Sequence, residues 1–187
     1  MRRRLAAAAA AVTLLALPAL FGATAARAEL TQTSSTGFTS SFRGEVQAGA
    51  DATWRAIVQL PRWWSDAHTW SGKAANLSLD LQPGGCWCER WDDRGSPAAV
   101  QHAQVLTVLP GRLLRLRGNL GPLQALPVDG VLDIATGVQD GKTMLRLSYS
   151  VGGPADAGLE PLASAVDRVL AEQFKRLKAL AETGRAD

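Results

Sequence analysis

The two cysteines of this 187-residue chain are separated by one residue, in the run GGCWCERW at positions 84–91. Cys86 and Cys88 could hold a metal, act as a redox pair or form a disulfide. A structural zinc site takes four ligands, and the chain offers only two histidines besides these thiols, so we expect no metal. The one-residue spacing also differs from the two-residue gap of zinc fingers and thioredoxin-like redox motifs.

Two interpretations of the cysteines remain open once the run is placed on a strand. Alternating side chains put Cys86 and Cys88 on the same face, with their Cα atoms about 7 Å apart, at the limit that a disulfide spans. A disulfide would therefore need a bulge, which the preceding Gly84-Gly85 could supply. The alternative is a pair of buried or half-buried thiols.

The opposite face of the same strand carries Trp87, Glu89 and Trp91. If this face is the inner one, a carboxylate lies among aromatic rings, and burial would raise its pKa unless a cation pairs with it. Glu89 could then orient a polar ligand group or act as a general base. The alternative is a structural ion pair, with Arg117 as the partner. A slip of one residue would exchange Glu89 for Cys88 on the inner face.

His68 and His102 are the only histidines. His102 lies in a predicted strand, either as a hydrogen-bonded wall residue or, in an enzyme, as the acid–base partner of Glu89. It shares its predicted face with Val100, Gln104 and Leu106. His68 is expected at the rim of a pocket, beside Trp70. We find no serine nucleophile elbow and no glycine-rich phosphate loop, and we expect no cofactor.

Hydrophobic periodicity indicates the elements that would position these residues. Alternation from Phe38 to Phe42 predicts a half-buried strand. Asp51 is suited to cap a helix that ends near Val58, and Pro61 ends that helix or begins a second short one. Period-two alternation between turns predicts further strands, at residues 76–81, 86–91, 100–109, 112–120, 128–138 and 142–151.

A long amphipathic helix follows, with apolar residues at helical spacing from Leu159 to Leu180. Pro161 suits its first turn and Gly184 its end. The predicted fold class is α+β, a helix-grip arrangement in which an antiparallel sheet of about seven strands wraps around this helix, with two short helices after the first strand. A sheet that curls around one helix leaves a space between them, so the architecture predicts a ligand pocket.

Residues 1–28 have the pattern of a cleavable secretory signal: arginines at 2–4, an apolar run to about Leu20, and the small-x-small motif at 26–28. We expect cleavage after Ala28, a periplasmic or secreted protein, and no membrane segment after cleavage. Four of the 20 Lys and Arg residues would be removed, which leaves 16 against 17 Asp and Glu. The basic charge of the whole chain is therefore no sign of nucleic-acid binding.

Several motifs resemble the SRPBCC superfamily (START-like, Bet v 1-like), and within it the branch named for the activator of heat-shock-protein-90 ATPase. They are WW at 63–64, HTWSG at 68–72, NLSLD at 76–80, GGCWCE at 84–89, VQH at 100–102, RGNLGPLQ at 117–124, YSVGG at 149–153 and VDRVL at 166–170, with Gln173 and RLK at 176–178. The resemblance implies a START-like domain over residues 37–183. The polar residues 29–36 are expected to form a flexible lead-in, and residues 184–187 a tail.

The resemblance implies a cavity for lipids, steroids, polyketides or similar molecules, because the superfamily carries such ligands. We expect an exported binding protein for a small hydrophobic ligand. One alternative is a cyclase or dehydratase that uses Glu89 and His102. Another is a co-chaperone-like interaction module with Trp63 and Trp64 exposed as an apolar patch. Activation of a chaperone ATPase is not expected, since an exported protein meets neither that cytosolic chaperone nor ATP.

In this fold the segment around Trp63, Trp64 and Trp70 borders the pocket mouth, and tryptophan offers a large apolar contact area. We expect the inner face of the last strand and the long helix to complete the pocket, through Leu145, Leu147, Tyr149, Val151, Val166, Leu170 and Phe174. The predicted ligand-binding residues are Trp63, Trp64, His68, Trp70, Trp87, Glu89, Trp91, His102, Arg117, Tyr149 and Phe174.

Overall fold

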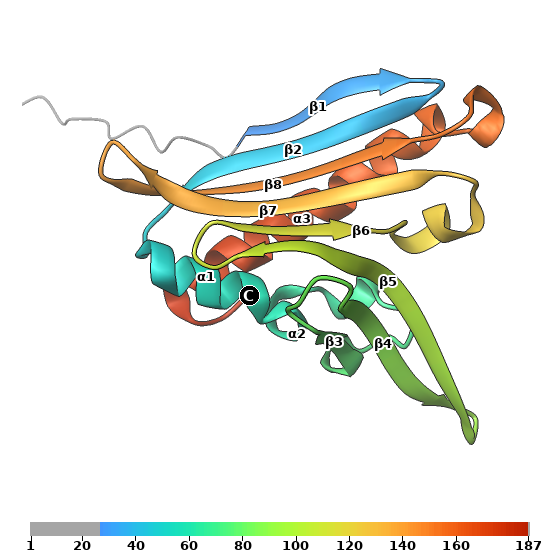
Figure 1. Ribbon diagram of the computed structural model, residues 1–187, viewed down its shortest axis with the longest axis horizontal. Helices are drawn as coiled ribbons and strands as arrows, with labels where there is room; N and C mark the ends of the chain where they lie inside the picture. The colour runs from blue at the N-terminus through green and yellow to red at the C-terminus, as the bar shows by residue number, and fades with distance from the viewer. Residues whose placement is uncertain (1–26, 187) are drawn as a thin grey trace, which may run out of the picture.

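The computed structural model describes residues 27–186, so the predicted signal segment lies outside the described residues except for its last two positions. One antiparallel sheet and one long helix dominate the fold (Figure 1). The strands are β1 (Arg27–Ser34), β2 (Gly37–Val46), β3 (Leu77–Leu79), β4 (Cys86–Asp93), β5 (Ser96–Leu109), β6 (Leu113–Arg117), β7 (Asp129–Gln139) and β8 (Lys142–Gly152). The helices are α1 (Ala50–Val58), α2 (Leu60–Trp63) and α3 (Glu160–Thr183).

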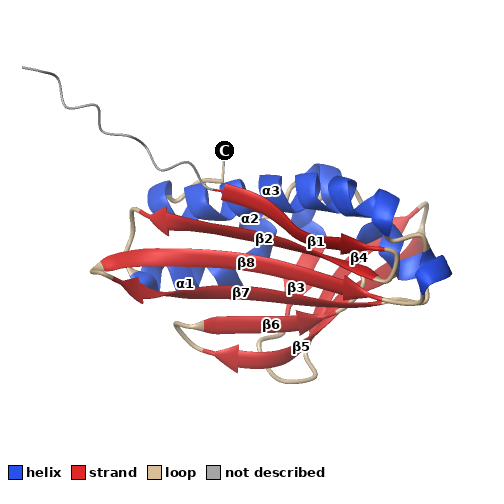
Figure 2. Ribbon diagram, turned by 90° about the horizontal axis from the view of Figure 1, so that it is seen from above, coloured by secondary structure: helices blue, strands red, loops and turns tan. Residues whose placement is uncertain are grey.

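The eight strands form a single sheet in the order β1-β2-β8-β7-β6-β5-β4-β3, and every neighbouring pair is antiparallel. Helix α3 runs along one face of this sheet, and α1 and α2 lie on the same side (Figure 2). Short 3-10 helices join the larger elements, at η1 (Asp66–His68), η2 (Ala74–Asn76), η3 (Gly121–Ala125) and η4 (Ala155–Ala157). The α+β helix-grip fold predicted from the sequence is confirmed.

The sheet has one strand more than the seven expected, because the predicted lead-in is wrong. Most of residues 29–36 belong to β1, which pairs with β2 from Arg27↔Arg43 to Ser34↔Gly37. This segment has no apolar stripe, but an edge strand needs only a backbone partner on one side, and its threonines favour extended structure. Residues 32–34 are exposed, as their polar side chains require.

The helix boundaries follow local signals, with one correction. Gly49 rather than Asp51 is the N-cap of α1, and Asp51 lies in the first turn without a side-chain capping bond. Its charge there still interacts favourably with the helix dipole. Pro61 lies in the first turn of α2, as predicted. Helix α3 ends at Gly184, whose φ of 78° is a left-handed conformation that glycine adopts without strain.

The core lies between the sheet and α3. Leu145, Leu147 and Tyr149 on the inner face of β8 are fully buried. Phe42 of β2 and Phe174 of α3 stack with their ring centroids 5.9 Å apart. The Phe42–Phe174 contact joins the C-terminal half of α3 to the sheet. No helix within residues 27–186 is long and apolar enough to cross a membrane.

A β-bulge between β4 and β5 determines which side chains face inward. Trp87 pairs with Ala103, whereas Cys88 pairs with Gln101, so His102 is the extra residue. His102 and Ala103 are consequently both buried. Beyond the bulge, the side chains that point inward are those predicted to point outward. Two residues that were predicted to share the inner face with His102 are therefore exposed. They are Gln104 and Leu106.

Candidate functional site

A cavity of about 540 Å³, here called the main cavity, lies beside the N-terminal half of α3. Helix α3 contributes Leu162, Ala165, Val166, Val169 and Leu170. The segment after α2 contributes Trp64, Ala67, His68, Thr69 and Trp70. Strand β5 and the region of η3 contribute His102, Leu120, Gly121 and Pro122. The volume falls within the range of small-molecule sites, and most of these side chains are apolar, as such sites usually are.

Four of the predicted ligand-binding residues line the main cavity: Trp64, His68, Trp70 and His102. Trp70 is 56% exposed and lies at the rim, whereas Trp64 is buried in the wall. Of the three helix residues expected to complete the pocket, Val166 and Leu170 line it and Phe174 does not. The inner face of β8 is core instead.

The other predicted ligand-binding residues lie outside the cavity wall. Trp63, Trp87, Glu89, Tyr149 and Phe174 are buried behind it. Trp91 is half-buried near the end of the β4–β5 hairpin, and Arg117 is exposed on β6. The proposed apolar patch is also wrong, because Trp63 and Trp64 are 0% and 5% exposed.

Sequence reasoning missed several lining residues, among them Leu120, Gly121 and Pro122. Leu120 was expected at the end of the predicted strand 112–120, whereas β6 ends at Arg117. Gly121 and Pro122 belong to no periodic pattern, so nothing in the sequence indicates that this segment turns back over the sheet. Leu162 and Val169 share the apolar stripe of α3, and that stripe alone does not show which part of the helix covers a space.

Glu89 and His102 are brought together by the β4–β5 pairing and the bulge. Glu89 is fully buried, and its Oε2 lies 2.9 Å from Nε2 of His102. The backbone N–H groups of Trp70 and Ser71 donate to the same carboxylate, at 3.0 Å to Oε2 and 2.6 Å to Oε1. The carboxylate therefore links β4 to the segment at the cavity rim that contains Trp70 and Ser71. Its partner is His102, and the predicted pairing with Arg117 is wrong.

The protonation states of this pair follow from its surroundings. Burial alone would raise the pKa of Glu89, but hydrogen bonds from Ser71, Trp70 and His102 together hold that pKa below the ordinary value. Burial lowers the pKa of His102 more than Glu89 raises it. At neutral pH the pair is thus an ionised carboxylate that accepts a hydrogen bond from a neutral imidazole.

A row of aromatic rings leads from the cavity wall at Trp64 to the imidazole of His102. The ring centroids of Trp63 and Trp64 lie 5.6 Å apart, those of Trp64 and Trp87 4.8 Å apart, and those of Trp87 and His102 5.2 Å apart. The Trp64 indole N–H donates to the backbone carbonyl of His68 at 2.8 Å. This aromatic row fixes the His102 ring and makes its surroundings apolar.

The rim segment after α2 is bound to α3 by polar contacts. The Ser65 N–H donates to Oε1 of Gln173 at 2.8 Å, and His68 Nε2 lies 3.0 Å from Oε2 of Glu172. A hydrogen bond from Ser65, together with that of His68, lowers the pKa of Glu172 despite some burial. These contacts hold one side of the main cavity at a fixed distance from the helix.

Tyr149 positions the opposite side of the cavity. Its hydroxyl donates to the Gly118 carbonyl at 2.9 Å and accepts from the Leu120 N–H at 3.1 Å. Burial raises the pKa of Tyr149 to about 12. A Cβ at Gly130 would lie 2.4 Å from this hydroxyl, so only glycine fits there. Tyr149 thus fixes the chain that leads into η3, rather than contacting the cavity.

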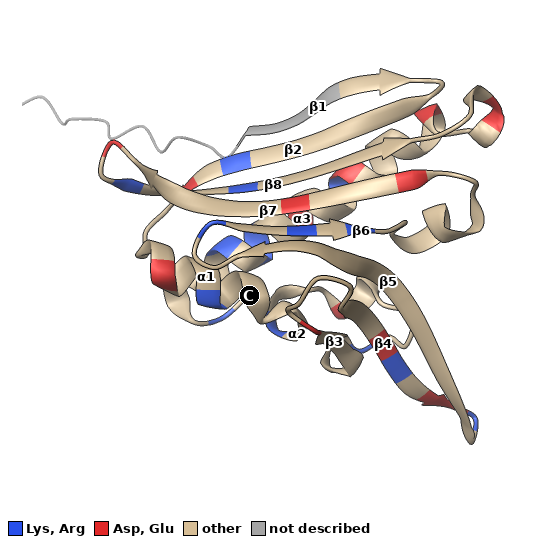
Figure 3. Cartoon of the chain, viewed as in Figure 1, with Lys and Arg blue, Asp and Glu red and all other residues tan. Residues whose placement is uncertain are grey.

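Arg117 makes an ion pair on the outer surface, where it lies 2.8 Å from Asp129 of the neighbouring β7. Charges of both signs are scattered over the sheet in this way (Figure 3).

Arg117 also borders a second cavity of about 380 Å³, together with Gln101, Asn119 and Gln124. His102 lines this second cavity as well as the main cavity.

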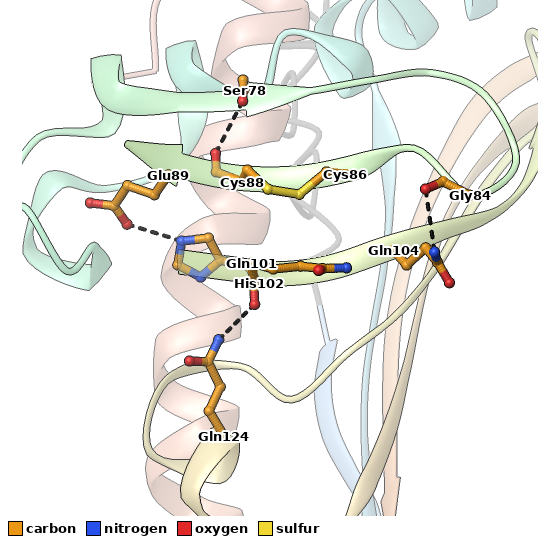
Figure 4. Close-up of a disulfide and its surroundings, with 9 residues drawn as sticks. All are labelled: Ser78, Gly84, Cys86, Cys88, Glu89, Gln101, His102, Gln104 and Gln124. Carbon is orange, nitrogen blue, oxygen red and sulfur yellow. Dashed lines mark hydrogen bonds and ion pairs between the residues drawn. A yellow bond between two sulfur atoms is a disulfide. The ribbon is translucent and has the colours of Figure 1, made fainter. Parts of the chain in front are cut away.

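The cysteines form a disulfide, with their Cα atoms 5.4 Å apart (Figure 4). The strand is therefore contracted relative to the spacing of about 7 Å between same-face neighbours. The irregularity lies opposite His102 rather than at Gly84-Gly85, which we expected to supply it. Gly85 has a different role, because a Cβ there would lie 2.1 Å from the Asp80 carbonyl oxygen.

Comparisons with known proteins support the fold. No protein-family model matches the chain, and no curated protein matches it. An uncharacterised protein from Rhizobium leguminosarum aligns with 19% identity and a TM-score of 0.55, over 84% of this chain and 98% of the other. The Aha1 dimer structure from Colwellia psychrerythraea aligns with 13% identity and a TM-score of 0.51, over 78% and 97%. Ara h 8.0201 aligns with 12% identity and a TM-score of 0.54, over 78% and 97%.

These neighbours include Bet v 1-like and Aha1 structures, which agrees with a helix-grip fold. At such low identity the likeness shows the fold alone. Function must therefore be argued from the site.

Proposed function

We propose that this chain is an exported protein that binds one small hydrophobic molecule in the main cavity. The observation that carries the proposal is the cavity itself, about 540 Å³ of space bounded mainly by apolar side chains. Export is inferred from the pattern of residues 1–28. Cleavage after Ala28 would leave Glu29–Ser34 to pair with β2.

Binding would be driven by burial of apolar surface, at about 25 cal/mol per Å² removed from water. Trp64 offers a rigid wall on one side, and Val166 and Val169 of α3 offer the other. A lipid, a polyketide-like molecule or an aromatic metabolite has the required size and polarity. The function would be carriage or sequestration of such a molecule outside the cytoplasm.

The test is to fill the cavity from α3. Val166→Trp places an indole in the space, whereas Ser164→Trp adds the same ring at an exposed position outside the wall. With the neutral dye N-phenyl-1-naphthylamine, we expect one site per chain, an affinity at least about tenfold weaker in Val166→Trp, and an unchanged affinity in Ser164→Trp. Equal dye binding by the wild type and both variants would contradict the proposal.

A cyclase or dehydratase acting in the same cavity is the second candidate. The observation that favours it is the buried contact between Glu89 and His102 at the cavity wall. Carriage predicts that a bound molecule is recovered unchanged after long incubation. An enzyme would return a product of altered mass, and Glu89→Gln would then remove turnover more than binding.

A further inference from the structure

We propose that His102 is the polar anchor of the main cavity, where its Nδ1 accepts a hydrogen bond from a hydroxyl group of a neutral, otherwise apolar ligand. The inference rests on the proposed function and adds a chemical class of ligand to it. Three features of the structure carry it: the location of the imidazole proton, the free second nitrogen, and the absence of cations from the wall.

The first feature is the location of the proton. The carboxylate of Glu89 receives hydrogen bonds from the backbone N–H groups of Trp70 and Ser71, which can only donate. An ionised carboxylate can only accept, so the third contact, with Nε2 of His102 at 2.9 Å, requires the proton to be on Nε2. In a neutral ring Nδ1 then carries a lone pair.

The second feature is that this lone pair is unused. Within residues 27–186, no side chain or backbone group makes a hydrogen bond to Nδ1 of His102. Nδ1 lies on the side of the ring away from Glu89, toward the chain segment that carries Gln124 (Figure 4). The ring is only 5% exposed, yet it borders the main cavity. An accessible acceptor without a protein partner, in an otherwise buried ring, favours a ligand that supplies a donor.

The third feature is the charge of the wall. The described residues around the main cavity include no lysine and no arginine. His68, the other histidine there, is engaged with Glu172. The ionised carboxylate of Glu89 lies directly behind His102. An anionic head group, such as that of a fatty acid, would find no cation and would be repelled. A neutral hydroxyl meets neither difficulty.

The aromatic rings near the anchor bear on the shape of the ligand. Trp64 lines the cavity and packs against Trp87, which in turn packs against His102. A hydroxyl that reaches Nδ1 therefore places the adjoining part of the ligand near the Trp64 ring. Flat ring systems make favourable edge and stacking contacts there. The proposed ligand class is a phenol or another hydroxylated ring compound.

The experiment compares three probes of one ring system by calorimetry. They are 2-naphthol, which has a neutral donor, 2-methoxynaphthalene, which has none, and 2-naphthoate, which is an anion. We expect 2-naphthol to bind about tenfold more tightly than either of the others to the full mature protein. The His102→Gln variant retains an N–H that can reach Glu89 but lacks the ring nitrogen Nδ1. In this variant we expect the preference for 2-naphthol over the other two probes to fall below about threefold.

A nitrogen NMR measurement reports on the anchor independently of affinity. Because the chain has only two histidines, His68→Gln assigns the signals of His102. We expect Nε2 to be the protonated nitrogen in the free protein. Addition of 2-naphthol should shift the Nδ1 signal, and 2-methoxynaphthalene should not.

The outcomes separate the two proposals. If the three naphthalene probes bind with equal affinity, and Val166→Trp blocks all three, the binding function stands and the anchor is overturned. A proton on Nδ1 in the free protein would also overturn the anchor. If none of the three probes binds, both the proposed function and the anchor fail.

Discussion

The two halves of helix α3 pack differently against the same sheet. In the C-terminal half, Phe174, Leu177 and Leu180 are buried, and Phe174 stacks on Phe42. In the N-terminal half, Val166 and Val169 are half-buried and border the main cavity. The large ring of Phe174 fills the space beside the C-terminal half. The smaller side chains of Val166 and Val169 leave open space beside the N-terminal half. Close packing and the main cavity therefore lie at opposite ends of one helix.

The largest expected effect is a difference in stability between substitutions in the two halves of α3. Phe174→Ala should lower the free energy of unfolding by about 3–5 kcal/mol, because it removes a buried ring and leaves a void. Val166→Ala, at a wall already next to open space, should lower it by about 1 kcal/mol. Urea unfolding of both variants measures the difference. Equal losses would show that the cavity end is packed as tightly as the other.

The next effect concerns the chain that forms the cavity wall near η3. Tyr149→Phe removes the hydroxyl that bonds Gly118 and Leu120 and leaves both backbone groups without it. We expect a loss of about 1–3 kcal/mol in unfolding free energy. Binding of N-phenyl-1-naphthylamine should also weaken, since Leu120 lines the cavity. A loss of stability without any change in dye binding would mean that Tyr149 supports only the core.

A smaller effect is expected from the disulfide. Because Cys86 and Cys88 are only two positions apart, the bond restricts a very short loop and should contribute about 1.5 kcal/mol. A Cys86→Ser/Cys88→Ser variant should show this loss in unfolding free energy, and reductant should give the same loss in the wild type. If reductant changes nothing while the variant is weakened, the serines rather than the missing bond are responsible.

The smallest effect is a dependence of stability on pH. Burial lowers the pKa of His102 in the folded state, so between its ordinary value of 6.5 and the lower folded value the unfolded chain binds the extra proton. Stability should therefore fall as the pH drops below 6.5, by at most about 1.4 kcal/mol per pH unit. Glu89, whose folded pKa is also lowered, adds a further loss below 4.5.

The matched control for this effect is His102→Gln, which cannot titrate. Its unfolding free energy should change less than that of the wild type between pH 6.5 and pH 5, a window of about 1.5 pH units. Denaturant titrations at several pH values provide the comparison. Parallel curves for the two proteins would show that His102 is not the group responsible.

Sequence periodicity predicted the fold class, because each main element has a local signal. The alternation of Leu145, Leu147, Tyr149 and Val151 placed these residues on the inner face of β8, and all four are buried. The strand β1 was missed because its residues carry no apolar alternation. Its formation depends on the backbone of β2, which is a tertiary effect.

The candidate site was predictable only in part. Types of residue identified Glu89 and His102 as candidates, but their contact depends on a bulge, and a bulge is decided by how two strands pair rather than by either sequence alone. The position of the cavity depends on the sizes of side chains that meet from distant elements. That is why Phe174, expected in the pocket, lies instead in the packed half.

The central claim is that the main cavity holds a small hydrophobic molecule, and native mass spectrometry of the protein purified from its own host tests it most directly. The account predicts a mature chain that begins at Glu29 and carries one apolar molecule with a hydroxyl group, which organic extraction would release and identify. A mature protein that consistently has the mass of the bare chain, and takes up neither N-phenyl-1-naphthylamine nor 2-naphthol, would contradict it.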